Sequence, residues 1–295
     1  MNYLSVSQMA KKWNMSERGV RKYCAEDKIP GAFLTGKTWN IPENAEKPKR
    51  KNKKSNEPQT LLERLKSEKA SHISGGIYHK IQIEFTYNSN AIEGNTLTIT
   101  ETKVILEDGL TIGGGKSLRE HLEVLNHKEA IDYIQDVVSK EFDLSERVIR
   151  DLHHIILKSI DNPNSGVYRK ANVLISGSMH RPPEYFLVED KMRELLDWYD
   201  ENKETMHPVK LAALFHFKYV YIHPFIDGNG RSARLLMNLI LLRNGYPLTV
   251  IRNTDRVDYM SALEKASTTG NTDEFVEFIA QAVDRSFDTY LYLIG

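Results

Sequence analysis

Apolar residues recur at helical spacing through most of the chain, from about residue 61 to its end. This period predicts helices within residues 61–92, 118–138, 144–160, 189–202, 208–222, 231–243 and 272–294. Residues 173–183 break the pattern, because they begin with β-branched Val173 and carry Ser-Gly-Ser at their centre, which predicts a β-hairpin. No internal repeat is visible, so a solenoid is not expected. The larger part of the chain is therefore expected to be an all-α bundle with one hairpin.

The first 45 residues show a different pattern, with two short helices and a turn-rich end. Ser5 or Ser7 can cap a first helix, and Ser16 can cap a second one that runs to about Glu26. The apolar side chains expected on the inner faces of these helices are Met9, Ala10, Trp13, Val20, Tyr23 and Cys24. Turn and strand signals in residues 29–42 predict a small wing after the helices.

Basic side chains would lie on the outer face of the second helix, at Arg18, Arg21 and Lys22. The region resembles the winged helix-turn-helix of excisionase and MerR-type DNA-binding domains, in which such side chains reach phosphates or base edges. Two other interpretations stay open. The module can bind a protein, or it can pack on the rest of the chain with its basic face in water.

The composition is that of an ordinary soluble globular protein of about two domains. The 295 residues include 40 Lys+Arg and 40 Asp+Glu, with 40% apolar and 27% charged residues. No apolar stretch is long enough to span a bilayer, and the N-terminal residues lack the apolar core of a secretory signal. A single cysteine, Cys24, excludes an internal disulfide framework. These features predict a cytoplasmic protein that does not bind membranes.

The balanced net charge hides an asymmetry along the chain. Residues 1–58 carry 13 Lys/Arg and 6 Asp/Glu, a net of +7, and the remainder carries a net of −7. Residues 47–54, KPKRKNKK, predict a solvated linker or a segment that contacts nucleic-acid phosphates. The expected domains are residues 1–45, a basic linker at 46–60, and a helical domain at 61–295.

The stretch HPFIDGNGRSAR, which begins at His223, holds the most informative chemistry in the sequence. Residues 228–230, Gly-Asn-Gly, can turn successive backbone N–H groups toward one anion, just before a helix N-terminus. Arg231 and Arg234 lie one turn apart and can reach the same phosphate oxygens. Asp227 can hold Mg²⁺ between phosphates, and His223 can take a proton near neutral pH. Each feature alone is commonly structural, but together they indicate a nucleotide site.

The same stretch matches the signature HPFxxGNGRxxR of the Fic (filamentation induced by cAMP) family without a departure. Residues 166–169, GVYR, resemble the family's G-x-Y-R segment, which precedes a β-hairpin flap, and the resemblance extends over residues 61–295. It implies a Fic-type helical bundle. It also implies an enzyme that transfers AMP from ATP to a hydroxyl of a target protein and releases pyrophosphate.

The resemblance further implies roles for single residues of the loop. His223 would act as the general base on the target's Ser, Thr or Tyr hydroxyl, and Asp227 would bind the Mg²⁺ that bridges the α- and β-phosphates. The phosphate ligands that it implies are Gly228, Asn229, Gly230, Arg231 and Arg234. Such a site works mainly through positioning and charge neutralisation.

Two further regions take their roles from the resemblance. The flap would align the target by strand addition, which reads backbone rather than side chains. Its target-docking residues are Val173, Leu174 and Ile175. Tyr259 or Met260 would cover the adenine. Related enzymes often carry an aromatic residue at Met260 and an asparagine near Ser267, and a minority of the family transfers UMP, GMP or phosphocholine, so the nucleotide preference stays open.

Residues 89–95, SNAIEGN, match the inhibitory motif that some Fic proteins carry N-terminal to the catalytic core. Residues 91–97, AIEGNTL, look especially like the animal endoplasmic-reticulum Fic enzyme. By that resemblance, Glu93 pairs with Arg234 and takes the place of the ATP γ-phosphate, so that the protein rests in a weakly active state. Without the catalytic loop, Glu93 would be interpreted as a helix-end residue before a glycine cap.

The leading hypothesis is an autoinhibited, Mg²⁺-dependent protein adenylyltransferase with an N-terminal module that binds DNA or a partner. One alternative is a bifunctional or mainly de-AMPylating enzyme in which Glu93 orients a water. Another is a DNA-binding regulator that uses the helical core as a nucleotide sensor. The sequence does not identify the target hydroxyl, which can belong to the protein itself, and a homodimer is expected only by analogy.

Four histidines lack metal-ligand spacing and are interpreted as packing or surface residues: His121, His127, His153 and His154.

Overall fold

The computed structural model of the chain describes residues 2–36, 38–48, 76–140 and 142–294. The chain divides into two compact units, residues 1–58 and 59–295, and each unit has its own buried core. The linker predicted at residues 46–60 falls mostly outside the described residues, as do residues 61–75 of the first helical prediction.

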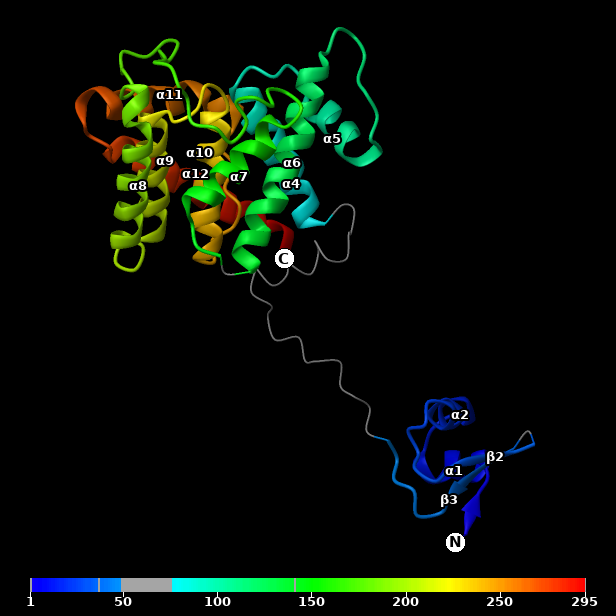
Figure 1. The fold of residues 1–295 in the computed structure, drawn as a ribbon. Coiled ribbons are helices and arrows are strands. Elements are labelled where there is room, and N and C mark those ends of the chain that lie inside the picture. Colours follow the sequence, from blue (N-terminus) through cyan, green and yellow to red (C-terminus); the bar gives the residue numbers. More distant parts are fainter. Residues whose placement is uncertain (1, 37, 49–75, 141, 295) are drawn as a thin grey trace. The chain divides into compact units, whose positions relative to one another are not determined.

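The smaller unit consists of two helices and a three-stranded antiparallel sheet of order β1-β3-β2 (Figure 1). Its elements are β1 (Tyr3–Leu4), α1 (Val6–Trp13), α2 (Glu17–Ala25), β2 (Phe33–Thr35) and β3 (Thr38–Pro42). Both helices begin where the sequence predicts, because the side chains of Ser5 and Ser16 cap them. Tyr23, predicted to point inward, is only partly buried. The buried core comprises Val6, Met9, Ala10, Trp13, Val20, Cys24, Ile29 and Ile41.

The larger unit is a bundle of helices, which confirms the predicted fold class (Figure 1). Its longer helices are α4 (Ile77–Ile92), α5 (Ile99–Asp108), α6 (Leu118–Ser139), α7 (Glu146–Leu157), α8 (Val188–Asn202), α9 (Pro208–Ile222), α10 (Asn229–Arg243), α11 (Arg256–Thr269) and α12 (Asp273–Ile294). The apolar period located most of them to within a few residues. It did not predict α5 or α11, whose buried faces are narrow.

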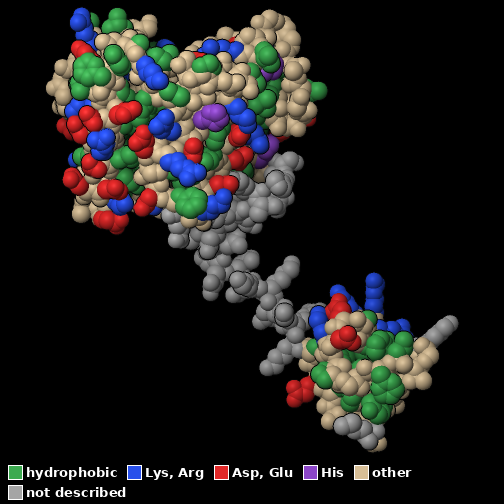
Figure 2. Space-filling model, in the orientation of Figure 1, with side chains coloured by type: hydrophobic (Ala, Val, Ile, Leu, Met, Phe, Trp, Pro, Cys, Tyr) green, Lys and Arg blue, Asp and Glu red, His purple; other side chains and the backbone are tan. Residues whose placement is uncertain are grey.

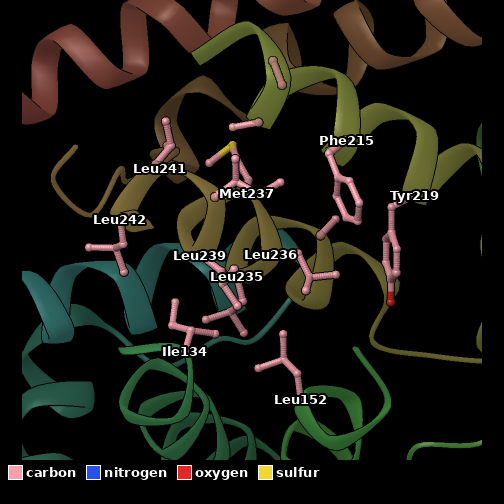
Figure 3. Packing of buried hydrophobic residues seen from close by; sticks show 14 of the residues in the cluster. Ile134, Leu152, Phe215, Tyr219, Leu235, Leu236, Met237, Leu239, Leu241 and Leu242 are labelled. Atoms are coloured by element: carbon pink, nitrogen blue, oxygen red, sulfur yellow. The ribbon is translucent and has the colours of Figure 1, made fainter. Parts of the chain in front are cut away.

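The centre of the bundle is α10, which is buried on all sides. Figure 3 shows Leu235, Leu236 and Leu239 of this helix among side chains from its neighbours, with Ile134 from α6 and Leu152 from α7. Residues 235–242 of α10 are apolar except for Asn238, and a helix segment that is apolar around its whole circumference belongs in a protein interior. Because α10 begins at Asn229, the core of the bundle fixes the start of the helix that carries the loop chemistry.

The chain reversal predicted at residues 173–183 is present, with a turn in which the Ser178 amide donates to the Ile175 carbonyl at 3.1 Å and Gly177 has φ +78°. No strand is assigned to its arms, and within the described residues the paired strands lie in the smaller unit. The polar groups of the segment bind neighbouring elements instead. Ser178 and the Met179 amide donate to Glu264 of α11.

Of the helices in the described part of the chain, none has both the length and the apolar character required to cross a bilayer. The surface of the larger unit instead mixes acidic and basic side chains, as Figure 2 shows for one face.

Candidate active site

The turn between α9 and α10 is held in shape by its own residues. His223 ends α9 in the left-handed region, with φ 52° and ψ 62°, a conformation that few non-glycine residues adopt. The Asn229 side chain then closes the turn, because its Oδ1 accepts the Phe225 amide at 3.0 Å and its Nδ2 donates to the Phe225 carbonyl at 2.9 Å. From the sequence we expected Asn229 to bind the phosphates. In the structure both polar atoms of its side chain are used to hold the shape of the loop.

Arg169 holds the front of the turn from outside. It is buried, and its Nε donates to the His223 carbonyl at 2.9 Å, while its backbone amide donates to the Pro224 carbonyl at 2.9 Å. A further guanidinium nitrogen donates to the Pro183 carbonyl at the end of the flap segment. Arg169, the arginine of the GVYR segment, thus connects the flap segment to the backbone at His223.

His153 holds the back of the turn, a role that the sequence did not reveal. Its Nδ1 accepts the Gly166 amide at 2.9 Å, so Nε2 carries the proton and donates to the Asp227 carbonyl at 2.8 Å. Its ring stacks on Phe225, with centroids 3.5 Å apart and planes 4° from parallel. Burial lowers the pKa of His153 to about 4, which keeps the ring neutral and preserves this pattern. His153 is a buried packing residue, as one of the two sequence interpretations had it, and it also fixes the shape of the loop.

A cleft of about 560 Å³ opens on one side of the turn. The predicted residues that line it are Glu93, Leu174, Ile175, His223, Gly230, Arg234, Tyr259 and Met260. Val173, Asp227, Gly228, Asn229 and Arg231 are not among its lining residues. The structure therefore brings the expected base, one arginine, the flap and the adenine-side candidates around one space.

His223 is neutral at physiological pH. Burial lowers its pKa to about 4, and neither the Val220 backbone nor the Glu93 carboxylate, which both act to raise it, offsets this effect. Its Nδ1 is buried and has no hydrogen-bond partner among the described residues. A neutral imidazole at the edge of a cleft is able to accept a proton from a bound hydroxyl.

Arg234 and Glu93 form the pair that the resemblance implied. The Arg234 side chain is 1% exposed, and its NH2 donates to Glu93 Oε1 at 2.7 Å and to the Ser89 carbonyl at 2.8 Å. Gly230 makes room for this contact, since a Cβ there would lie 2.2 Å from Glu93 Oε1. The Glu93 carboxylate thus lies beside the first turn of α10, where an anion is stabilised.

A second group of charges surrounds Asp227. Its Oδ1 accepts the Gly228 amide at 2.6 Å and Arg231 NH2 at 3.4 Å, and its Oδ2 accepts Arg119 NH2 at 2.5 Å. Burial alone would raise the pKa of Asp227, but Arg231, the Gly228 amide and Arg119 together lower it, so the carboxylate is ionised. Arg231 also lies 3.3 Å from Glu123 of α6. Neither Arg119 nor Glu123 was predicted.

The surroundings of Asp227 fit a magnesium ion that arrives with a nucleotide. No cluster of three or more acidic, histidine or cysteine side chains suited to a metal occurs among the described residues. Mg²⁺, however, commonly uses one or two carboxylates and takes its other ligands from phosphates and water. The Asp227 side chain is 41% exposed, so such an ion can reach it.

The two adenine-side candidates differ in their surroundings. Tyr259 is 1% exposed, and its hydroxyl lies 3.0 Å from His216 Nε2 and 3.5 Å from Arg234 NH1. Its polar end therefore supports Arg234 within the core. Met260 is only partly buried and lies on the cleft with Ser267, so it has the accessible side chain of the two.

The fold and the loop together define a class of protein: a helical bundle whose central helix begins at the HPFIDGNGR turn. The model of the Fic/DOC family matches residues 143–241. A curated relative, Protein adenylyltransferase Fic of Nematostella vectensis, is 42% identical over 207 residues, which is 70% of this chain and 48% of the relative.

Solved structures agree with this class. Fic-1 (residues 134–508) from C. elegans is 31% identical with a TM-score of 0.68, and the match covers 79% of this chain and 71% of that one. A Fic domain containing signaling protein from Bacteroides thetaiotaomicron is 34% identical with a TM-score of 0.66, covering 79% of this chain and 95% of that one. The chain belongs to the Fic/DOC family. It spans about half the length of the curated relatives it matches.

Proposed function

We propose that the protein is an adenylyltransferase that transfers AMP from ATP to a hydroxyl of a target protein. The observation that carries this proposal is the cleft that neutral His223 lines together with Gly230 in the first turn of α10 and buried Arg234. Relatives that match most of this chain are named for the same activity. The nucleotide preference is proposed as ATP on that basis.

In the proposed reaction, His223 accepts the proton of the target hydroxyl, and the hydroxyl oxygen forms a bond to the α-phosphorus. The bond between the α-phosphorus and the bridging oxygen of the β-phosphate breaks, and pyrophosphate leaves. Arg231, Arg234 and the N–H groups at the start of α10 hold the charge of the phosphates. Asp227 would hold a Mg²⁺ ion, which would supply positive charge to the phosphates of the nucleotide.

The flap supplies the place for the target. Leu174 is 83% exposed at the mouth of the cleft, and Ile175 lines the cleft beside it. Because the arms carry no strand pairing in the structure, an extended target segment can add to them through main-chain hydrogen bonds. Glu264 holds the turn of the segment at Ser178 and Met179, and Arg169 holds its end at Pro183, which would direct the bound hydroxyl toward His223.

The resting protein is proposed to be autoinhibited by Glu93. Its carboxylate accepts a hydrogen bond from the Arg234 guanidinium, to which a γ-phosphate would otherwise bind. ATP then binds without the alignment that the reaction needs. Replacing Glu93 with glycine should free Arg234 and leave His223 in place.

The test uses ATP labelled with ³²P at the α-phosphorus and compares wild type, Glu93→Gly, His223→Ala and the double variant. Strong labelling of protein in Glu93→Gly alone, lost again in the double variant, is the expected result. If Glu93→Gly binds ATP but labels neither itself nor proteins of a cell lysate, the transferase assignment is wrong.

A second activity at the same site is the removal of AMP from modified proteins. Glu93 favours it, because its carboxylate lines the same cleft as His223 and is 35% exposed, so it can orient a water. Incubation of a pre-modified target with wild type and with Glu93→Gly separates the two reactions. Release of AMP only by wild type would support removal, whereas no release by either protein would exclude it for that target.

We further propose that the smaller unit binds DNA. Arg18, Arg21 and Lys22 are exposed on α2, and in Figure 2 the basic side chains of this unit gather on the side where α2 lies. Two helices followed by a β-hairpin wing are the expected arrangement for a recognition helix. The full chain should bind duplex DNA with an affinity that falls steeply with salt, and Arg18→Ala with Arg21→Ala should reduce that slope. Salt-independent binding, or none, would contradict this.

A further inference from the structure

The charged residues of the loop each have an internal partner of the opposite charge. The pairs are Arg234–Glu93, Arg231–Glu123 and Asp227–Arg119. In each pair, the partner carries the charge of the group that the proposed substrate would place there. Carboxylates stand opposite the two arginines, where phosphates would bind, and a guanidinium stands opposite the aspartate, where a cation would bind.

Arg119 reaches Asp227 from the first turn of α6, although the two residues are 108 positions apart in the chain. Its NH2 donates to Asp227 Oδ2 at 2.5 Å, and its Nε donates to Glu123 Oε1 at 3.2 Å. The Arg119 side chain is 55% exposed. The guanidinium therefore covers Oδ2 of the carboxylate without being buried itself.

The two oxygens of Asp227 are not equivalent. Oδ1 accepts the Gly228 amide and Arg231 NH2, and these bonds belong to the loop itself. Oδ2 accepts Arg119 NH2. A cation that binds Asp227 from the solvent side would use Oδ2, so Arg119 and the cation require the same oxygen.

We propose that Arg119 belongs to the active site and acts through Asp227: its guanidinium occupies the cation position in the resting site, and Mg²⁺ must displace it. This inference rests on the proposed function, because it takes Asp227 as the carboxylate that receives the ion. The exposed side chain can swing away, and its bond to Glu123 keeps it near the site afterwards. A half-exposed ion pair is weak, so its competition should change the metal affinity about three- to fivefold.

The experiment measures Mn²⁺ binding by electron paramagnetic resonance, with saturating α,β-methylene-ATP, in the full chain carrying Glu93→Gly. Arg119→Met keeps the length of the side chain without its charge, and Arg119→Lys keeps the charge. Arg193→Met is the matched control, because it removes a guanidinium that pairs with Asp190 at 3.0 Å on the exposed face of α8.

Arg119→Met should lower the Mn²⁺ dissociation constant about three- to fivefold, and the gain in affinity should shrink at high salt. Arg119→Lys and Arg193→Met should stay within about twofold of the parent. Calorimetry without metal should show unchanged affinity for the nucleotide analogue in Arg119→Met. Unchanged or weaker Mn²⁺ binding in Arg119→Met would overturn the inference, and so would weaker metal-free nucleotide binding, which would make Arg119 a phosphate ligand.

Asp227→Asn distinguishes a failure of the inference from a failure of the proposed metal site. It should abolish the nucleotide-dependent Mn²⁺ signal in every background. If the signal persists in Asp227→Asn, the ion binds elsewhere, and the proposed metal site is wrong together with the role of Arg119. If the signal is lost but Arg119→Met behaves as the parent, only the role of Arg119 is wrong.

Discussion

The proposed base, His223, stands in a left-handed backbone conformation, and side chains from distant parts of the chain keep it there. Arg169 donates to the His223 carbonyl, and His153 donates to the Asp227 carbonyl from the opposite side of the turn. Neither side chain lines the cleft. We therefore expect both to be positioning residues, whose effect on the proposed reaction would pass through the backbone of the loop.

Replacing His153 tests this at the residue scale. In the Glu93→Gly background, His153→Ala should lower kcat about 10- to 100-fold with a smaller change in KM for ATP, because the loop loses its anchor. His153→Gln should recover part of the rate, since its amide N–H can reach the Asp227 carbonyl. Steady-state kinetics check both values, with circular dichroism to confirm folding. An unchanged kcat in His153→Ala would contradict the role.

The site residues that lie in short motifs were predictable, including the pair Glu93–Arg234 across 141 positions, but the partners that lie outside such motifs were not. His223, Arg234 and Glu93 lie in short motifs whose chemistry is legible in sequence. Arg119 and His153 meet Asp227 across 108 and 74 positions, and such contacts depend on how helices pack. Their only local signals are an exposed arginine in a helix and a histidine among apolar residues, which are common and point to no particular partner.

At the scale of elements, the apolar period found the helices with wide buried faces and missed the narrow ones. In α5 the buried residues are Thr102 and Ile105, and in α11 they include two alanines, so neither helix shows a strong apolar stripe. The flap segment was predictable only in part. Its turn follows from Ser-Gly-Ser, but its polar groups bind Glu264 and its arms stay unpaired, and the local sequence does not encode these features.

The central position of α10 predicts a large effect of a core substitution there. Leu235 is 0% exposed, so Leu235→Ala should lower the free energy of unfolding by about 2–5 kcal/mol. Leu118→Ala is the matched control, because Leu118 is 72% exposed and its loss should change stability by less than about 0.5 kcal/mol. Urea unfolding of both variants checks this. Equal effects would show that α10 is not the core of the bundle.

At the scale of the whole molecule, buried neutral histidines should make the protein sensitive to acid. Burial lowers the pKa of His153 and His223 to about 4 and that of His216 to about 3. In the unfolded chain these rings titrate near pH 6.5, so below that pH the unfolded state binds more protons than the folded state. Stability is therefore full above about pH 6.5 and is lost as pH falls toward 4.

Between pH 7 and pH 5, each fully buried histidine of this kind should cost about 2 kcal/mol of unfolding free energy. Urea titrations at these two pH values measure the difference. His216→Phe, which fills the fully buried site with a ring that cannot titrate, should reduce the pH dependence. Stability that stays constant or rises as pH falls would show that these rings are not neutral in the fold.

The proposed reaction transfers the adenylyl group of ATP, so the position of a radioactive label in ATP distinguishes it from transfer of any other group. Glu93→Gly should be incubated with ATP carrying ³²P at either the α- or the γ-phosphorus, and the protein should then be separated from free nucleotide. We predict that protein retains the α-label and that the γ-label leaves with pyrophosphate. Retention of the γ-label, or of neither label by the variant or any target offered, would contradict the proposed reaction.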